Sequence, residues 1–143
     1  MRPSFRRKLL PASTLVALAT FLFWFSLYVY VPFLPGHTES LGASAAMVGT
    51  VVAAYAVAQL VLRIPIGIWA DSLGRRKPFV VAGLLFAALG ALGLGLSPGP
   101  WFLFVSRAVT GVAAVAWVPT MVLYVSYFSA QKVPRAMGVI MAV

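Results

Sequence analysis

The chain has 143 residues, of which 62% are hydrophobic and only 9% charged, and its mean hydropathy is +1.00. Soluble domains carry about 25% charged residues, so this composition favours a membrane protein. The net charge of +9 does not indicate nucleic-acid binding, because the cations lie at the ends of apolar runs rather than on one soluble face. Cysteine is absent, and one His with two acids makes a metal site unexpected, so no metal or cofactor is predicted.

Long gaps between charged residues predict the membrane spans. Each gap can hold the roughly 20 apolar residues that a membrane helix needs, and a backbone in lipid must satisfy its own hydrogen bonds as a helix. We therefore expect an all-α membrane protein with four full transmembrane helices and the start of a fifth. The expected helices are 11–33, 45–70, 78–96, 101–125 and an incomplete 134–143.

The first span is rich in aromatic residues, and Tyr28 is the one we expect to contact a substrate. Pro32 and Pro35 should end or bend this helix. A cleaved signal peptide is the alternative, but the apolar segment exceeds the usual 7–15 residues of a signal peptide's core. We favour a retained helix. His37 and Glu39 are expected to be solvated in the loop that follows.

Lysine and arginine predict the orientation. Nine of the eleven cations precede the first span, join the second to the third, or follow the fourth, whereas the loops 34–44 and 97–100 have none. The positive-inside rule then places the N-terminus in the cytoplasm of a multi-pass protein of the plasma (inner) membrane.

Small residues spaced four apart predict where helices approach closely, because such positions share a helix face and small side chains favour packing in lipid. This spacing occurs twice, in the second and third spans. The two sets are Ala46, Thr50, Ala54 and Ala58, and Gly83, Ala87, Ala91 and Gly95.

The loop between the second and third spans carries a fixed order of a glycine, a lone acid, a second glycine and a basic triplet. As residues, Asp71 and Arg75 are four apart and predict a local exposed ion pair. The order resembles the corresponding loop of major facilitator superfamily transporters. That resemblance implies a cytoplasmic latch between the two halves of a transporter. The residues it implies are Gly67, Asp71, Gly74, Arg75 and Arg76.

Arg107 lies inside the fourth span, where a charge needs water, an acid or backbone carbonyls. Either it snorkels to the outer interface, or it faces a central cavity and binds an anionic group. Arg107 and Gly111 resemble a second motif of the same family, which implies a role in proton coupling. Tyr55 and Gln59 in the second span are candidates for polar substrate contacts, and Arg63 is expected to snorkel.

We therefore expect part of a secondary active transporter that moves a small organic solute by alternating access, with efflux slightly favoured over uptake. Its expected partners are the lipid bilayer, a small-molecule substrate and the missing C-terminal half of the same protein. Protons are an open alternative as coupling ion, since the first span lacks the acid found in many proton-driven members. The alternative function is a non-transporting small membrane protein, either an accessory subunit or a decayed remnant. No nucleophile–base pair or phosphate loop predicts an enzyme.

Overall fold

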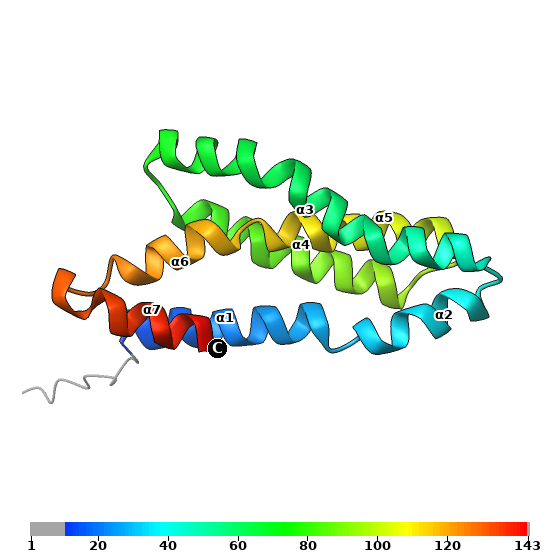
Figure 1. Ribbon diagram of the computed structural model, residues 1–143, viewed down its shortest axis with the longest axis horizontal. Helices are drawn as coiled ribbons and strands as arrows, with labels where there is room; N and C mark the ends of the chain where they lie inside the picture. The colour runs from blue at the N-terminus through cyan, green and yellow to red at the C-terminus, as the bar shows by residue number, and fades with distance from the viewer. Residues whose placement is uncertain (1–10, 143) are drawn as a thin grey trace, which may run out of the picture.

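The computed structural model describes residues 11–142, and their regular structure is entirely helical (Figure 1). Four stretches are long and apolar enough to cross a membrane: Ala12–Ser40, Ala45–Leu73, Lys77–Gly95 and Pro100–Val125. The predicted all-α membrane fold, with four full spans and the start of a fifth, is confirmed. The helices are α1 (Ala12–Tyr28), α2 (Leu34–Ser40), α3 (Ala45–Leu73), α4 (Lys77–Gly95), α5 (Pro100–Ala114), α6 (Trp117–Val125) and α7 (Val133–Ala142), with short 3-10 helices η1 (Val31–Phe33) and η2 (Ala130–Lys132).

The spans alternate in direction, so the turns gather at two ends of the bundle. The α3–α4 and α6–α7 connections lie at the left end in Figure 1, and the α2–α3 turn lies at the right end. The cations of the first connection, Arg75 to Lys77, and of the second, Lys132 and Arg135, therefore share one end. We call this the basic end. Four further cations that the orientation prediction uses, Arg2, Arg6, Arg7 and Lys8, lie outside the described residues.

The first span differs from its prediction as one helix over 11–33 followed by a loop. Helix α1 ends at Tyr28, η1 follows, and α2 continues through Ser40. His37 and Glu39 therefore lie on a helix and not in a loop. Pro32 lies in η1, where the span departs from an α-helix, and Pro35 stands in the first turn of α2, where its missing N–H leaves no helical bond unmade. The span is therefore bent but not ended.

The fourth span is also interrupted, which the sequence analysis did not expect. Helix α5 ends at Ala114 and α6 begins at Trp117. Pro119 is the physical reason, because a proline ring clashes with the carbonyl four residues earlier, here that of Val115. The chain adapts with tighter bonds, from Val115 N–H to Val112 O and from Ala116 N–H to Ala113 O, both 3.1 Å.

Helix α4 packs on α5 through small residues, but the predicted set is only half right. Gly83 and Ala87 are buried, whereas Ala91 and Gly95 are exposed. The buried face continues instead through Gly90 and Leu94. A helix turns every 3.6 residues, so a strict four-residue spacing drifts off the contact face after two turns. In α3 the earlier residues of the predicted set are the exposed ones. Ala46 and Thr50 are exposed, whereas Ala54 is buried.

Helix α3 ends three residues later than expected and places Asp71 in its last turn instead of in a loop. It begins at the N-cap Ser44, whose hydroxyl accepts a bond from Met47 N–H at 3.3 Å. It ends at Gly74, which has a left-handed φ of +60°. This conformation suits glycine because it has no Cβ, and it produces the sharp turn into α4.

Candidate functional site

Arg107 of α5 is enclosed by aromatic side chains from two other segments. Its side chain is only 4% exposed. Its Nη1 donates a hydrogen bond of 2.8 Å to the hydroxyl of Tyr30, which lies between α1 and η1. Its Cζ lies 4.4 Å from the ring centroid of Tyr55 on α3 and 5.4 Å from that of Tyr30. The structure therefore contradicts snorkelling, and the guanidinium is held by two ring faces and a hydroxyl.

These contacts explain how a charge is held inside an apolar bundle. A cation over an aromatic face gains about 2 kcal/mol or more when both groups are desolvated. Within the described residues, however, Arg107 Nε and the Tyr55 hydroxyl are buried without a hydrogen-bond partner. An unpaired buried donor is costly, and a donor beside a buried positive charge favours an anionic or strongly accepting group. The cluster is thus incomplete as a hydrogen-bonding site.

Gly111, one turn beyond Arg107, fixes the distance between α3 and α5. A Cβ at this position would collide with the carbonyl oxygen of Tyr55 and lie 3.0 Å from Ala58 Cβ. Glycine therefore lets the two backbones touch and brings the Tyr55 ring over Arg107. Gln59, one turn further along α3, is half-buried.

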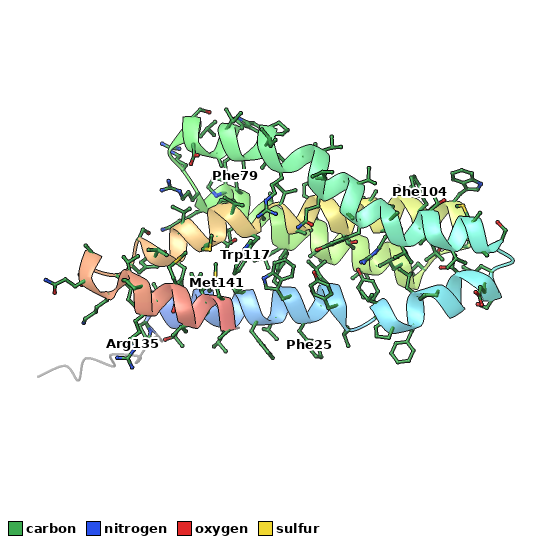
Figure 2. The ribbon with its side chains drawn as sticks, in the orientation of Figure 1. Phe25, Phe79, Phe104, Trp117, Arg135 and Met141 are labelled. Atoms are coloured by element: carbon green, nitrogen blue, oxygen red, sulfur yellow. The ribbon has the colours of Figure 1, made fainter. Side chains whose placement is uncertain are left out.

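An aromatic wall extends from this cluster along α1 to α6. Tyr55 meets Tyr28 edge to face with ring centroids 6.4 Å apart, Tyr28 stacks on Trp24 at 5.6 Å, and Trp24 meets Trp117 at 5.5 Å. Trp24, Tyr28 and Trp117 also line a hollow of 350 Å³ beside Ile140 and Met141 of α7. Figure 2 shows Trp117 and Met141 at this place, with Phe25 pointing out of the bundle. Tyr28, one of the three predicted substrate contacts, lines this hollow.

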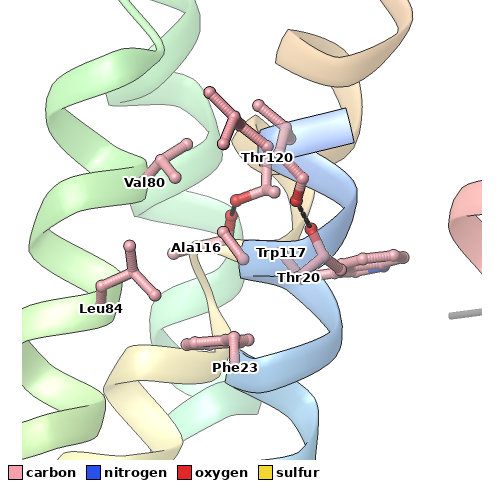
Figure 3. Close-up of a pocket in the computed structure, with 10 residues that line it drawn as sticks. Thr20, Phe23, Val80, Leu84, Ala116, Trp117 and Thr120 are labelled. Carbon is pink, nitrogen blue, oxygen red and sulfur yellow. Dashed lines mark hydrogen bonds between the residues drawn. The ribbon is translucent and has the colours of Figure 1, made fainter. Parts of the chain in front are cut away.

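A second, smaller cavity of 160 Å³ lies between α1, α4 and the α5–α6 junction (Figure 3). Its polar groups are already satisfied, since the hydroxyls of Thr20 and Thr120 donate to the carbonyls of Val16 and Ala116 at 2.8 and 2.6 Å. Phe23, Leu84 and Trp117 supply apolar surface. This cavity is therefore lined mainly by apolar surface and suits an apolar group.

The predicted latch residues lie at the basic end of the bundle, away from Arg107. Asp71 pairs with Arg76, with 3.7 Å between Oδ1 and Nη2, and not with Arg75 as predicted. The predicted pair with Arg75 assumed a helix that continues for four residues, but α3 stops at Leu73 and Gly74 reverses the chain. Both partners are solvent-accessible, with side chains 76% and 35% exposed. A Cβ at Gly67 would meet nothing within 4 Å, so no described helix packs closely on this glycine. Arg63 is exposed, as snorkelling requires.

Two residues of this site, Tyr30 and Trp117, were not predicted from the sequence. A signal for Tyr30 was present, because the four spans contain no acid that could reach Arg107, and tyrosine hydroxyls are the next acceptors available. Trp117 carried no comparable signal. Its contact with Trp24 depends on the α5–α6 break, which turns α6 toward α1.

Comparison with known proteins identifies the family of this chain. The family model described as Major Facilitator Superfamily matches residues 16–143. Inner membrane transport protein YajR of Escherichia coli (strain K12) is 35% identical over 91 residues, 63% of this chain and 20% of that protein. Multidrug resistance proteins 2 and 1 of Bacillus subtilis (strain 168) are 30% and 31% identical over 123 and 128 residues. These matches cover 85% and 87% of this chain but 30% and 33% of the relatives.

The chain therefore belongs to the Major Facilitator Superfamily, a family of membrane transporters and not of enzymes. It is an integral multi-pass membrane protein of that family. It spans a third or less of the length of these three relatives.

Proposed function

We propose that this chain supplies the N-terminal portion of a secondary transporter that exports a small organic solute across the inner membrane by alternating access. The missing C-terminal half would complete the cargo site and the latch. Arg107 would provide positive charge at the centre, and the aromatic wall of Trp24, Tyr28 and Trp117 would contact apolar parts of the cargo. Several relatives are named for resistance to drugs, which supports export over uptake.

The observation that carries this proposal is the incomplete cluster around Arg107. A buried cation is expensive in a membrane and is typical of a functional site. Here its Nε has no acceptor among the described residues, and it adjoins a wall of aromatic side chains. An acceptor on the cargo, or a carboxylate from the other half, would complete the cluster.

Transport in energised inverted vesicles tests this assignment. The vesicles would contain the longer transporter of which this chain forms part, with ethidium as the probe. We expect Arg107→Gln to lower the initial rate of uptake into the vesicles at least about tenfold, as removal of a charge-assisted contact should. Arg107→Lys should retain part of the rate. Val105→Ala is the matched control, because Val105 lies on the same helix and is 56% exposed. An unchanged rate in Arg107→Gln would refute the central role.

We infer the orientation from the basic end, which would face the cytoplasm. The absence of cysteine makes single-cysteine labelling direct. Ser72→Cys lies at the basic end and Ser40→Cys at the opposite end, and both positions are exposed. In intact cells a membrane-impermeant maleimide should label only Ser40→Cys. Labelling of Ser72→Cys alone would reverse the orientation.

Proton coupling would require an acid close to Arg107. The described spans contain Asp71, which lies at the basic end, and Glu39 on α2, but neither pairs with Arg107. A coupling acid would therefore come from outside residues 11–142. In the whole transporter, dissipation of the proton gradient should abolish uptake if protons drive it, whereas a uniporter would be unaffected.

The alternative function is a small membrane protein that does not transport. The enclosed Arg107 cluster favours it in one respect, since no described hollow opens directly onto the guanidinium. Expression of residues 1–143 alone decides between the two. Stable accumulation without any change in ethidium efflux from the cells would favour the alternative for this chain by itself.

A further inference from the structure

Two hollows adjoin one another at the basic end, away from the Arg107 cluster. The inner groove, as we call it, has a volume of 360 Å³ and lies between the last turns of α3, the first turns of α4 and the α5–α6 junction. The basic recess has a volume of 340 Å³ and is formed by Gly74 to Lys77 with Leu123 of α6 and Ser126, which follows that helix. Pro78 lines both hollows, so they share a wall.

The inner groove is apolar along its length. Its walls include Ile66, Trp69, Phe79, Phe86 and Val112. Trp69 remains 59% exposed and meets Phe79 edge to face, with ring centroids 5.6 Å apart. Figure 2 shows Phe79 in the space between α3 and α4. At membrane depth an open apolar groove of this kind is suited to a hydrocarbon chain, because it offers no hydrogen bonds to a polar ligand.

The basic recess has the opposite chemistry. It contains Arg75, Arg76 and Lys77, and the nearby acid Asp71 pairs only with Arg76, at 3.7 Å. Within residues 11–142, Arg75 and Lys77 have no carboxylate partner. The recess therefore presents two uncompensated cations where the helices end, which is the level of lipid headgroups.

We propose that an anionic phospholipid binds here, with its phosphate in the basic recess and one acyl chain in the inner groove. Only an amphipathic anion matches both hollows at once. Free phosphate would use the recess alone, and a zwitterionic lipid would fill the groove without net attraction to Arg75 and Lys77. Lipid binding is independent of any cargo, so this proposal does not rest on the transport function above.

Tryptophan fluorescence tests the proposal, because Trp69 lines the groove. The 143-residue chain with Trp24, Trp101 and Trp117 changed to Phe is reconstituted in vesicles. These contain either phosphatidylglycerol or phosphatidylcholine with brominated acyl chains, which quench nearby tryptophan. We expect the site to bind phosphatidylglycerol about fivefold or more tightly than phosphatidylcholine. Each cation near the membrane surface raises the affinity for an anionic lipid by about a factor of five. A chain retaining only Trp101, which is 72% exposed and distant from the groove, is the control and should show no preference.

Two variants separate the headgroup from the acyl chain. Lys77→Gln should reduce the preference about fivefold without changing quenching by phosphatidylcholine. Ala82→Phe, which fills the groove, should reduce quenching by both lipids. Its matched control is Ala91→Phe, on the opposite, exposed face of α4. Helix content by circular dichroism verifies that each variant folds.

Three results would overturn the proposal. Equal quenching of Trp69 by the two lipids would remove the selectivity for an anionic headgroup. Loss of the preference in excess inorganic phosphate at constant ionic strength would indicate a site for free phosphate. Absence of quenching by either lipid would mean that no acyl chain enters the inner groove.

Discussion

The two halves of α3 differ sharply, although they belong to one helix. Before Pro65, α3 packs closely on α5, and Val51, Ala54 and Tyr55 are buried. Beyond Pro65 the helix borders the inner groove, and Ile68 is 66% exposed. The helix thus holds the Tyr55 ring over Arg107 in one half and leaves the predicted latch residue Asp71 accessible in the other.

The difference follows from what each half must hold. A buried arginine needs fixed partners, because its charge is destabilising wherever the surrounding contacts loosen. An exposed pair such as Asp71–Arg76 has no such requirement, since solvent or lipid headgroups can replace either partner. Close packing through Gly111 therefore accompanies the buried charge, and the open groove accompanies the surface charges.

The largest expected effect comes from adding one methyl group to the packed half. Gly111→Ala would place a Cβ against the carbonyl oxygen of Tyr55, which is backbone and cannot rotate away. We expect a loss of about 1–3 kcal/mol in the free energy of unfolding, typical of an overpacked core. The midpoint of unfolding in SDS–detergent mixtures, followed by circular dichroism, measures it.

Gly67→Ala is the matched control in the open half, because a Cβ there meets nothing within 4 Å. Alanine is the better helix former, so this variant should be neutral or slightly more stable. If the two alanine variants lost stability equally, the contrast between the halves of α3 would be disproved.

A smaller effect should follow from removing single hydroxyl groups around Arg107. Tyr30→Phe leaves Nη1 without its acceptor and should cost about 1–2 kcal/mol of unfolding free energy. Tyr55→Phe keeps the ring face and removes a hydroxyl that has no described partner, so it should be neutral or stabilising. The same unfolding measurement compares them. A larger loss in Tyr55→Phe would show that this hydroxyl is bonded after all.

The sequence predicted four spans and the start of a fifth, because charge is excluded from lipid and long gaps between charges mark the spans. It failed where the outcome depended on three-dimensional contacts. The partner of Asp71 changed because Gly74 turns the chain, and the packing face of α4 drifted from Ala91 to Gly90. The enclosure of Arg107 depended on Tyr30, which the bend between α1 and η1 brings to α5. Single-sequence periodicity contains no information on such bends.

Gly74 offers a third comparison, between the turn that ends α3 and the body of that helix. Gly74→Ala forces a side chain into a left-handed conformation and should cost about 1 kcal/mol of unfolding free energy, although no neighbour would be touched. Gly49→Ala, in the body of α3 with equally open space, should cost nothing. The measurement is again the SDS unfolding midpoint. Equal midpoints for these two variants would mean that the turn does not require glycine.

The smallest effect on stability is expected at the exposed pair of Asp71 and Arg76, which the resemblance assigns to a latch. It tests the open half of α3 where its packing matters least. Asp71→Asn removes an ion pair whose partners are 76% and 35% exposed, so unfolding free energy should change by about 0–1 kcal/mol. If Asp71 forms a latch with the other half of a transporter, the initial rate of uptake should nevertheless fall in the whole protein. Arg76→Gln is the companion variant, because it breaks the same local pair and leaves the carboxylate in place. A rate that falls in Asp71→Asn but not in Arg76→Gln would assign the role to the carboxylate rather than to its local pair. Unchanged rates of uptake in both variants would refute a latch function for Asp71 and Arg76. The pair would then contribute little either to transport or to the free energy of unfolding.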